Sequence, residues 1–109
     1  GRAQGRKIVV KQIGAGGNPN SVHILFVSNT TAAARRTALV RATRGNPVLI
    51  VGETVGFAEA GATINLYITR NPVTRNATVA YELNPAALRR RSLRPSADLT
   101  QHGRSVRDR

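Results

Sequence analysis

The sequence predicts an α/β fold: a mixed central sheet with a βαβ unit, a C-terminal antiparallel hairpin and flanking helices. Two observations predict this class. Two wholly apolar, strand-length segments flank one helix-like segment within about thirty residues, the arrangement of a parallel strand pair with a right-handed crossover. Two alternating segments follow, separated by a polar loop that contains Pro72, which is typical of an antiparallel hairpin.

The first segments supply the parallel strands. Lys7–Ile13 is short, β-branched and apolar, which predicts a strand, and Gly14–Asn20 is predicted to be a loop because three Gly and a Pro break regular structure. Val22–Ser28 is apolar on both faces, so we expect a central strand covered on both sides. Pro47–Gly52 is equally apolar and is expected to pair with it.

Thr30–Arg44 is the clearest helix. We expect Thr30 or Thr31 to cap its start, and Gly45 to end it with Pro47 two residues beyond. An apolar stripe at positions i, i+4, i+5 and i+8 is expected to face the core. The stripe consists of Ala34, Ala38, Leu39 and Ala42.

The hairpin follows a Gly-punctuated connection, Glu53–Ala62. In Thr63–Thr69 the apolar Ile64, Leu66 and Ile68 alternate with polar residues, and Ala77–Leu83 alternates in the same way. Alternation with period two is typical of strands that bury one face. The polar Arg70–Asn76 joins them.

A short helix and a tail complete the chain. Asn84 is expected to cap a helix whose first residue is Pro85 and which ends near Arg91. The chain is expected to be irregular from Pro95 and disordered from Gln101, where it is polar and charged without an apolar period. The predicted organisation is one domain over residues 1–100 and a disordered basic tail over 101–109.

The charge balance leaves two interpretations open. Lys and Arg number 17 against five acidic residues, so the net charge is +12 at pH 7. This charge is typical of a surface that binds nucleic acid or acidic lipid, but it also fits solvated Arg-rich faces. The second interpretation is favoured because the aromatic residues lie within apolar segments, not along a basic groove where bases could stack. These residues are Phe26, Phe57, Tyr67 and Tyr81.

Several kinds of chemistry lack their parts. The chain has no Cys, which excludes disulfides, zinc fingers and thiol catalysis. Gly14–Gly17 resembles the start of a dinucleotide-binding loop, but Pro19 stands where its third Gly belongs, and a strand follows where a helix is required. No apolar run approaches the roughly 20 residues of a membrane span.

Candidate acids, bases and metal ligands are scattered. His23 is expected in a buried strand and His102 in the tail, with no further ligand spaced to complete a metal site. Nothing in the spacing of Glu53, Glu59 and Glu82 forces two carboxylates together for acid–base work. The sequence therefore predicts no catalytic residue, no cofactor and no metal. A small hydrolase or transferase using Glu59 or Glu82 remains an alternative.

Three segments carry a family resemblance: HILFVS at His23–Ser28, PVLIVGETVGFAEAGATINLY at Pro47–Tyr67 and YELNPAALRRRSL at Tyr81–Leu93. Their order and motifs resemble the YfiR family of bacterial periplasmic proteins, over most of the chain. In physical terms the motif is largely structural, since glycines permit tight turns and a Phe can fill the core beneath the loop. The motif positions are His23, Gly56, Phe57, Glu59, Gly61, Ile64, Asn65, Tyr81, Glu82 and Asn84.

The resemblance implies a periplasmic α/β protein, often a homodimer, that negatively regulates a membrane-anchored diguanylate cyclase by binding the enzyme's periplasmic domain. Cyclic-di-GMP signalling, and hence biofilm formation, would respond to envelope conditions. Neither the cyclase chemistry nor the dinucleotide would involve this chain directly. Arg89, Arg90 and Arg94 are a candidate partner surface, because Arg is enriched in interfaces. A basic nucleic-acid-binding module is the alternative function.

The sequence departs from the family pattern at four points. Val22 stands where members often carry Cys, and the loop Arg70–Asn76 is longer than usual. An N-terminal helix and strand of the family are expected to be absent, which would expose a sheet edge and favour weak stability or dimerisation. Ser92 stands where the turn after the last helix usually has Gly, and Ser accepts a left-handed conformation less readily.

Overall fold

The computed structural model describes residues 2–3, 6–7 and 17–108. Apart from Lys7, the predicted strand Lys7–Ile13 therefore lies outside the described residues, as does the first part of the loop Gly14–Asn20. A small antiparallel ribbon joins β1 (Arg2–Ala3) to β2 (Arg6–Lys7). A single 3₁₀ turn, η1 (Pro19–Ser21), precedes the main sheet.

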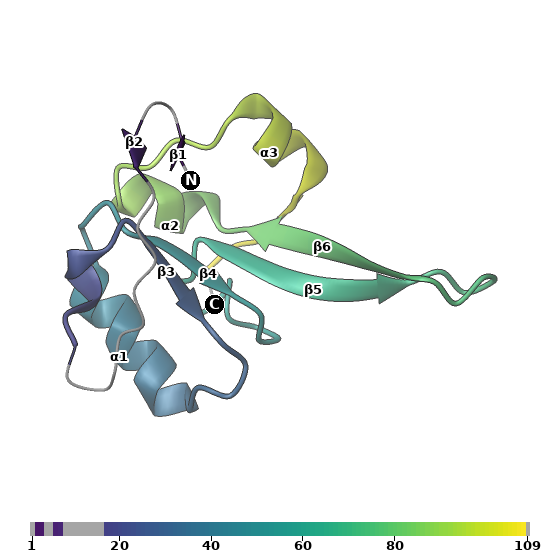
Figure 1. The fold of residues 1–109 in the computed structure, drawn as a ribbon, viewed down its shortest axis with the longest axis horizontal. Helices are drawn as coiled ribbons and strands as arrows, with labels where there is room; N and C mark the ends of the chain where they lie inside the picture. The colour runs from purple at the N-terminus through teal and green to yellow at the C-terminus, as the bar shows by residue number, and fades with distance from the viewer. Residues whose placement is uncertain (1, 4–5, 8–16, 109) are drawn as a thin grey trace.

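The main sheet is mixed, as predicted, and within the described residues its strand order is β3-β4-β5-β6-β7 (Figure 1). The β3–β4, β4–β5 and β6–β7 pairs are parallel, and β5–β6 is antiparallel. The predicted βαβ unit and hairpin are thereby confirmed. The strands are β3 (Ile24–Val27), β4 (Leu49–Gly52), β5 (Ile64–Arg70), β6 (Ala77–Leu83) and β7 (Arg104–Ser105).

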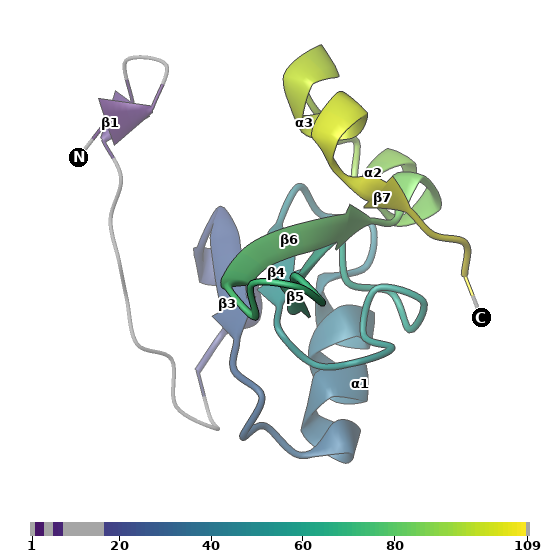
Figure 2. The same ribbon diagram turned by 90° about the vertical axis from the view of Figure 1, so that its right-hand side faces the viewer.

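Helix α1 (Ala33–Thr43) crosses from β3 to β4 and covers one face of the sheet (Figures 1 and 2). The predicted alanine stripe is wrong, because its three Ala residues are exposed. The helix instead turns Leu39, Val40 and Thr43 inward. Burying Leu and Val removes more apolar surface from water than burying Ala, so the larger side chains set the orientation. They pack against a core that includes Leu25, Val27, Ile50 and Phe57.

The two ends of α1 differ in how well the sequence predicted them. Gly45 adopts φ +82 after the helix and ends it, as expected. Neither Thr30 nor Thr31 caps the start. The N-cap residue is Ala32, which offers no side-chain acceptor, while the Thr30 hydroxyl lies 2.8 Å from the hydroxyl of Ser28. The Thr30 hydroxyl therefore serves the turn before the helix.

Strand β3 is not covered on both sides. It lies at the edge of the sheet within the described residues, and its side chains alternate between core and solvent. Leu25 and Val27 are buried against α1, whereas Ile24 and Phe26 are 56 % and 55 % exposed. Within the part of the chain that the structure describes, β3 is therefore neither central nor covered on both faces, because α1 packs on one face.

The C-terminal part contains more regular structure than the sequence predicted. Asn84 caps α2 (Pro85–Arg90) as expected, since its Oδ1 accepts a hydrogen bond from the Ala87 N–H at 3.0 Å. Where an irregular segment and a disordered tail were predicted, α3 (Ala97–His102) forms and β7 pairs with β6. The Tyr81 hydroxyl anchors α3 by donating to the Leu99 carbonyl at 2.7 Å. Tertiary contacts order this basic segment despite its weak local propensity.

The Arg91 guanidinium is buried at the C-terminal end of α1. Only 3 % of the residue is exposed. Nη1 donates to the Thr43 carbonyl at 3.1 Å, the Thr43 hydroxyl at 2.7 Å and the Val48 carbonyl at 3.4 Å, while Nη2 donates to the Val40 carbonyl at 3.2 Å. All four acceptors are neutral, and burial lowers the pKa of Arg91. The carbonyl end of a helix favours a cation, so α1 supplies the compensation.

We expect Arg91→Met to lower the free energy of unfolding by about 3 kcal/mol, because it strands several buried carbonyls without removing much volume. Urea unfolding measures the loss. Arg89→Met is the matched control: Arg89 lies two residues earlier and is exposed, so the effect should stay within about 0.5 kcal/mol. Equal losses in both variants would contradict the assigned role.

The turn after α2 is left-handed at Ser92, where φ is +57. The Leu93 N–H donates to the Leu88 carbonyl at 2.9 Å and the Ser92 N–H to the Arg89 carbonyl at 3.0 Å. This is a Schellman motif whose left-handed position usually holds Gly. The departure noted in the sequence therefore places a Cβ in a strained conformation.

Ser92→Gly should raise the free energy of unfolding by about 1 kcal/mol by removing that strain. Thermal unfolding would then show a melting temperature several degrees higher. Ser92→Ala keeps the Cβ and removes only the exposed hydroxyl, so it should give no gain. Stabilisation by Ala equal to that by Gly would mean that the backbone conformation is not the cause.

Candidate functional site

A polar cluster fastens the loop after β4 to the strands. Asn65 donates through Nδ2 to the Thr54 carbonyl at 2.8 Å and to Glu82 Oε1 at 3.2 Å, and its Oδ1 accepts from the Thr54 N–H at 3.2 Å. The other Glu82 oxygen forms an ion pair with Arg104, whose guanidinium lies over the Tyr67 ring at 5.2 Å. Both oxygens of Glu82 thus serve the architecture, and the motif residues Asn65 and Glu82 are structural partners.

The remaining residues of the loop motif shape its turns and fill the space beneath it. Gly56 and Gly61 adopt φ +83 and +118, and a Cβ on Gly61 would lie 2.8 Å from Val40 Cγ1. Phe57 is buried in the core below the loop, as predicted. Glu59 is half-buried, and its Oε2 has no hydrogen-bond partner among the described residues.

The candidate acid–base groups have different surroundings. His23 is exposed immediately before β3, which corrects the expectation of a buried histidine. Glu53 accepts from the Asn29 N–H at 3.0 Å, and Glu82 is held in the polar cluster. Two surface cavities, of about 180 and 210 Å³, are lined by neither His nor Glu. The arrangement brings together no constellation for acid–base chemistry within the described part of the chain.

The face of the sheet opposite α1 is apolar; Ile64 and Leu83 on it are buried, and its other apolar side chains are half-buried or exposed. Residues that pair in register point to the same face, so Ile24 lies beside Leu49 and Ile68 beside Val79. Four of the six large hydrophobic side chains exposed among the described residues lie here, between 55 % and 66 % exposed. We call this surface the open face; it comprises Ile24, Phe26, Leu49, Val51, Leu66, Ile68 and Val79.

An exposed apolar patch of this kind is typical of a surface that binds another macromolecule. The sequence analysis missed it, because unbroken apolar runs were interpreted as strands buried on both sides. The feature of the sequence that indicated an exposed sheet face was the number of predicted helices. One strong helix was predicted between the parallel strands, and a single crossover helix covers only one face of a sheet.

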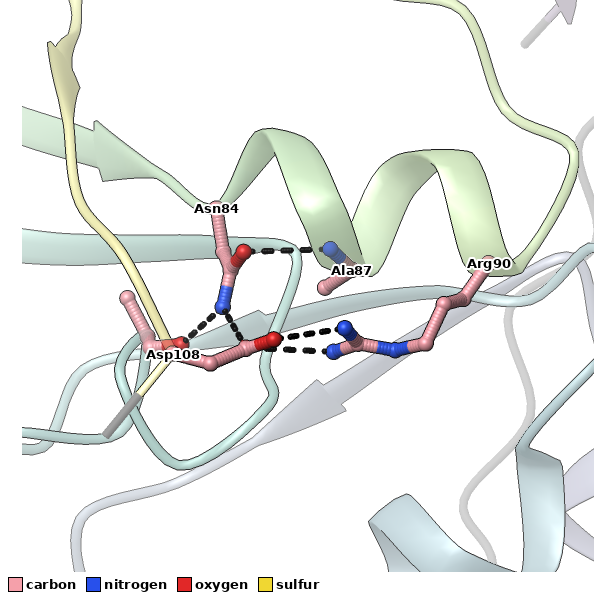
Figure 3. Close-up of polar contacts among 5 residues, drawn as sticks. Asn84, Ala87, Arg90 and Asp108 are labelled. Atoms are coloured by element: carbon pink, nitrogen blue, oxygen red, sulfur yellow. Dashed lines mark hydrogen bonds and ion pairs between the residues drawn. The ribbon is translucent and has the colours of Figure 1, made fainter.

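The three arginines of the predicted partner surface have different surroundings. Arg90 pairs with Asp108, with Nη1 at 2.6 Å from Oδ2 and Nη2 at 3.2 Å from Oδ1 (Figure 3). Asn84 donates to the same carboxylate at 2.7 Å and to the Ala58 carbonyl at 2.8 Å. Arg90 therefore holds the C-terminal segment in place, while Arg89 and Arg94 are exposed.

The bonds from Arg90 and then Asn84 hold the pKa of Asp108 below its ordinary value of 3.8, and the same pair raises the pKa of Arg90. A carboxyl whose pKa is lowered on folding stabilises the fold above its unfolded pKa, and this contribution disappears as the pH falls through the folded pKa. Asp108→Asn should therefore cost about 0.5 kcal/mol at neutral pH, a small value because the pair is partly exposed.

Chemical denaturation between pH 7 and pH 2 measures this dependence. The difference in unfolding free energy between the parent and Asp108→Asn should shrink once the pH falls below 3.8. In an Arg90→Gln background the same substitution should have less effect at neutral pH. A difference that stays constant down to pH 2 would contradict the lowered pKa.

The aromatic rings are placed unlike a nucleic-acid platform. Phe57 is buried, Tyr67 lies under Arg104, and the hydroxyl of Tyr81 is bonded to α3. Only Phe26 exposes half of its surface. Stacking of successive bases needs several accessible rings along a basic groove, so the geometry favours protein contact over base recognition.

The fold and its motif residues can now be compared with known proteins. A family model described as YfiR/HmsC-like matches residues 1–104. The chain belongs to the YfiR/HmsC-like family. Membership implies a regulatory protein connected with diguanylate cyclases, in a family that is periplasmic in general and regulatory rather than catalytic.

No curated protein and no solved structure matches this YfiR/HmsC-like chain. Within the described ranges, none of its helices has the length and apolar character to cross a membrane. In the same residues, no group of three His, Cys, Asp or Glu side chains is placed to hold a metal ion.

Proposed function

We propose that this YfiR/HmsC-like protein acts in the periplasm as a non-enzymatic regulator that binds the periplasmic domain of a membrane-anchored diguanylate cyclase and represses it. Cyclic-di-GMP levels, and with them biofilm formation, would then depend on this contact. The open face is the observation that carries the proposal, and family membership supports the class of partner.

Binding at the open face gains free energy from apolar burial, and the protein does not have to change its conformation to expose that surface. Ile24, Phe26, Ile68 and Val79 already expose more than half of their surface, so a partner that covers them removes apolar area from water. Each Å² so buried contributes about 25 cal/mol before the entropic cost of association. The strands beneath are fixed by their ladders and by the core on the α1 side, which keeps the surface preorganised.

The positive charge of the protein favours an acidic partner. A net charge of +12 draws an acidic partner toward the protein and speeds association at low ionic strength. Arg89 and Arg94 are exposed, whereas Arg90 is occupied by Asp108. Charge reversal at Arg89, Arg90 and Arg94 tests whether these residues contribute to the partner contact. Unchanged affinity for the partner would show that they do not.

The double substitution Phe26→Ser with Val79→Ser should weaken binding to the cyclase periplasmic domain by at least about thirtyfold, or about 2 kcal/mol, because it removes two anchors of the open face. Isothermal titration with the purified domain measures affinity, and cellular cyclic-di-GMP reports repression. Val55→Ser with Val73→Ser is the matched control, since these residues are 98 % and 87 % exposed but lie outside the open face. Thermal unfolding checks that both variants keep the fold.

Equal affinity of the two double variants would reject the open face as the partner contact. No complex with the parent protein, together with unchanged cyclic-di-GMP after gene deletion, would reject the regulatory function itself. A family homodimer is the competing occupant of the open face. If sedimentation shows that only the Phe26–Val79 variant loses a dimer while cyclase binding persists, the surface belongs to self-association and the proposal fails.

A further inference from the structure

Helices α2 and α3 lie at the end of β6, on the side of the sheet away from α1 (Figure 2). Helix α2, the connection after it and α3 border a cavity of about 210 Å³, which we call the apolar hollow. Its lining includes Leu83, Leu88, Leu93 and Pro95, with the side chains of Arg89 and Arg94. No residue of the open face or of the polar cluster lines it, and the sheet contributes only Leu83 at the end of β6.

The walls of the apolar hollow are held by hydrogen bonds on both sides. The left-handed turn at Ser92 brings Leu93 back over Leu88, where its N–H bonds the Leu88 carbonyl. On the other side, Tyr81 donates to the Leu99 carbonyl, and the Ser96 hydroxyl caps α3 by accepting from the Leu99 N–H at 3.1 Å. These contacts all lie within the chain and fix the walls of the hollow.

The size of the hollow sets the size of the apolar group that it can take. A dry, apolar cavity of about 150 Å³ binds benzene. At about 210 Å³, the apolar hollow has room for an alkyl chain of about six carbons. Leucine and proline side chains offer such a chain dispersion contacts and no hydrogen bonds.

The positive charge beside the hollow indicates that the polar end of the ligand is an anion. Arg89 and Arg94 are exposed, and neither forms an ion pair with a carboxylate among the described residues. Arg90, which lies next to Arg89 in α2, is instead used by Asp108. Two uncompensated guanidinium groups next to an apolar cavity match an anion with an apolar tail, since Arg binds carboxylates with two parallel hydrogen bonds.

We propose that the apolar hollow binds a small amphiphilic anion, a short-chain alkyl carboxylate, with its chain between Leu88 and Leu93 and its carboxylate on Arg89 and Arg94. Such binding would give the regulator a chemical input from its surroundings. This inference goes beyond the proposed function and does not depend on it, because the site lies within this chain and its test needs no partner.

Titration of the ¹⁵N-labelled protein with hexanoate, followed by NMR, tests the site. Saturable shifts should centre on the amides of Leu88, Leu93 and Thr100, and 1-hexanol should bind more weakly because it lacks the charge. Arg89→Gln with Arg94→Gln should weaken hexanoate binding by about five- to tenfold. Arg70→Gln with Arg75→Gln removes the same charge from the hairpin, where both residues are exposed, and should leave the affinity unchanged.

A second variant tests the apolar part without touching the arginines. Thr100 lines the hollow from an exposed position in α3, so Thr100→Phe should fill the cavity and reduce hexanoate binding while thermal unfolding confirms the fold. Shifts scattered over all basic surfaces, equal weakening by the Arg70–Arg75 control, equal binding of hexanol, or no saturable shift would each overturn the proposal. None of these outcomes bears on the open face or the cyclase contact.

Discussion

The rest of the structure depends on a buried cation that has no counter-ion among the described residues. Arg91 reaches from the end of α2 to the carbonyl end of α1 and to the start of β4, and four neutral oxygens satisfy its donors. One side chain thus joins the crossover helix, the central sheet and the C-terminal helices. A guanidinium does not lose its proton in a protein, so Arg91 stays charged and its donors always need acceptors. The crossover helix, the sheet and the C-terminal helices must therefore keep their relative positions to supply those acceptors.

This constraint explains how the chain carries the open face and the apolar hollow as two separate surfaces. With α1 fixed on one face, the loop after β4 closes the same side through Asn65, Glu82 and Arg104. The opposite face is apolar, and within the described residues it is exposed at Ile24, Phe26, Ile68 and Val79 and buried at Ile64 and Leu83. At its end, α2 and α3 are held by the Schellman turn at Ser92 and by Tyr81, and they leave the apolar hollow between them.

Some of the residues that hold the structure together can be recognised in the sequence from local rules, and others cannot. The cap at Asn84 and the turns at Gly56 and Gly61 follow from local rules, and the structure has them where the sequence predicted. The partners of Glu82 and Arg90 do not follow from such rules, because Arg104 and Asp108 lie about twenty residues away in a segment without an apolar period. Long-range ion pairs leave no pattern in a single sequence, which is why the tail was predicted to be disordered.

The sequence by itself determined the order of the elements from β3 to α2, the parallel crossover, the hairpin and the family. Each of these depends on apolar periodicity or on backbone preferences of Gly, Pro and Asn, which act within a few residues. Only the tertiary structure decided which side of an apolar strand meets solvent and which arginine is buried. A sequence shows that a position holds an apolar residue or an arginine, but it does not show what packs against that side chain. The burial of the side chain depends on segments that come from distant parts of the chain.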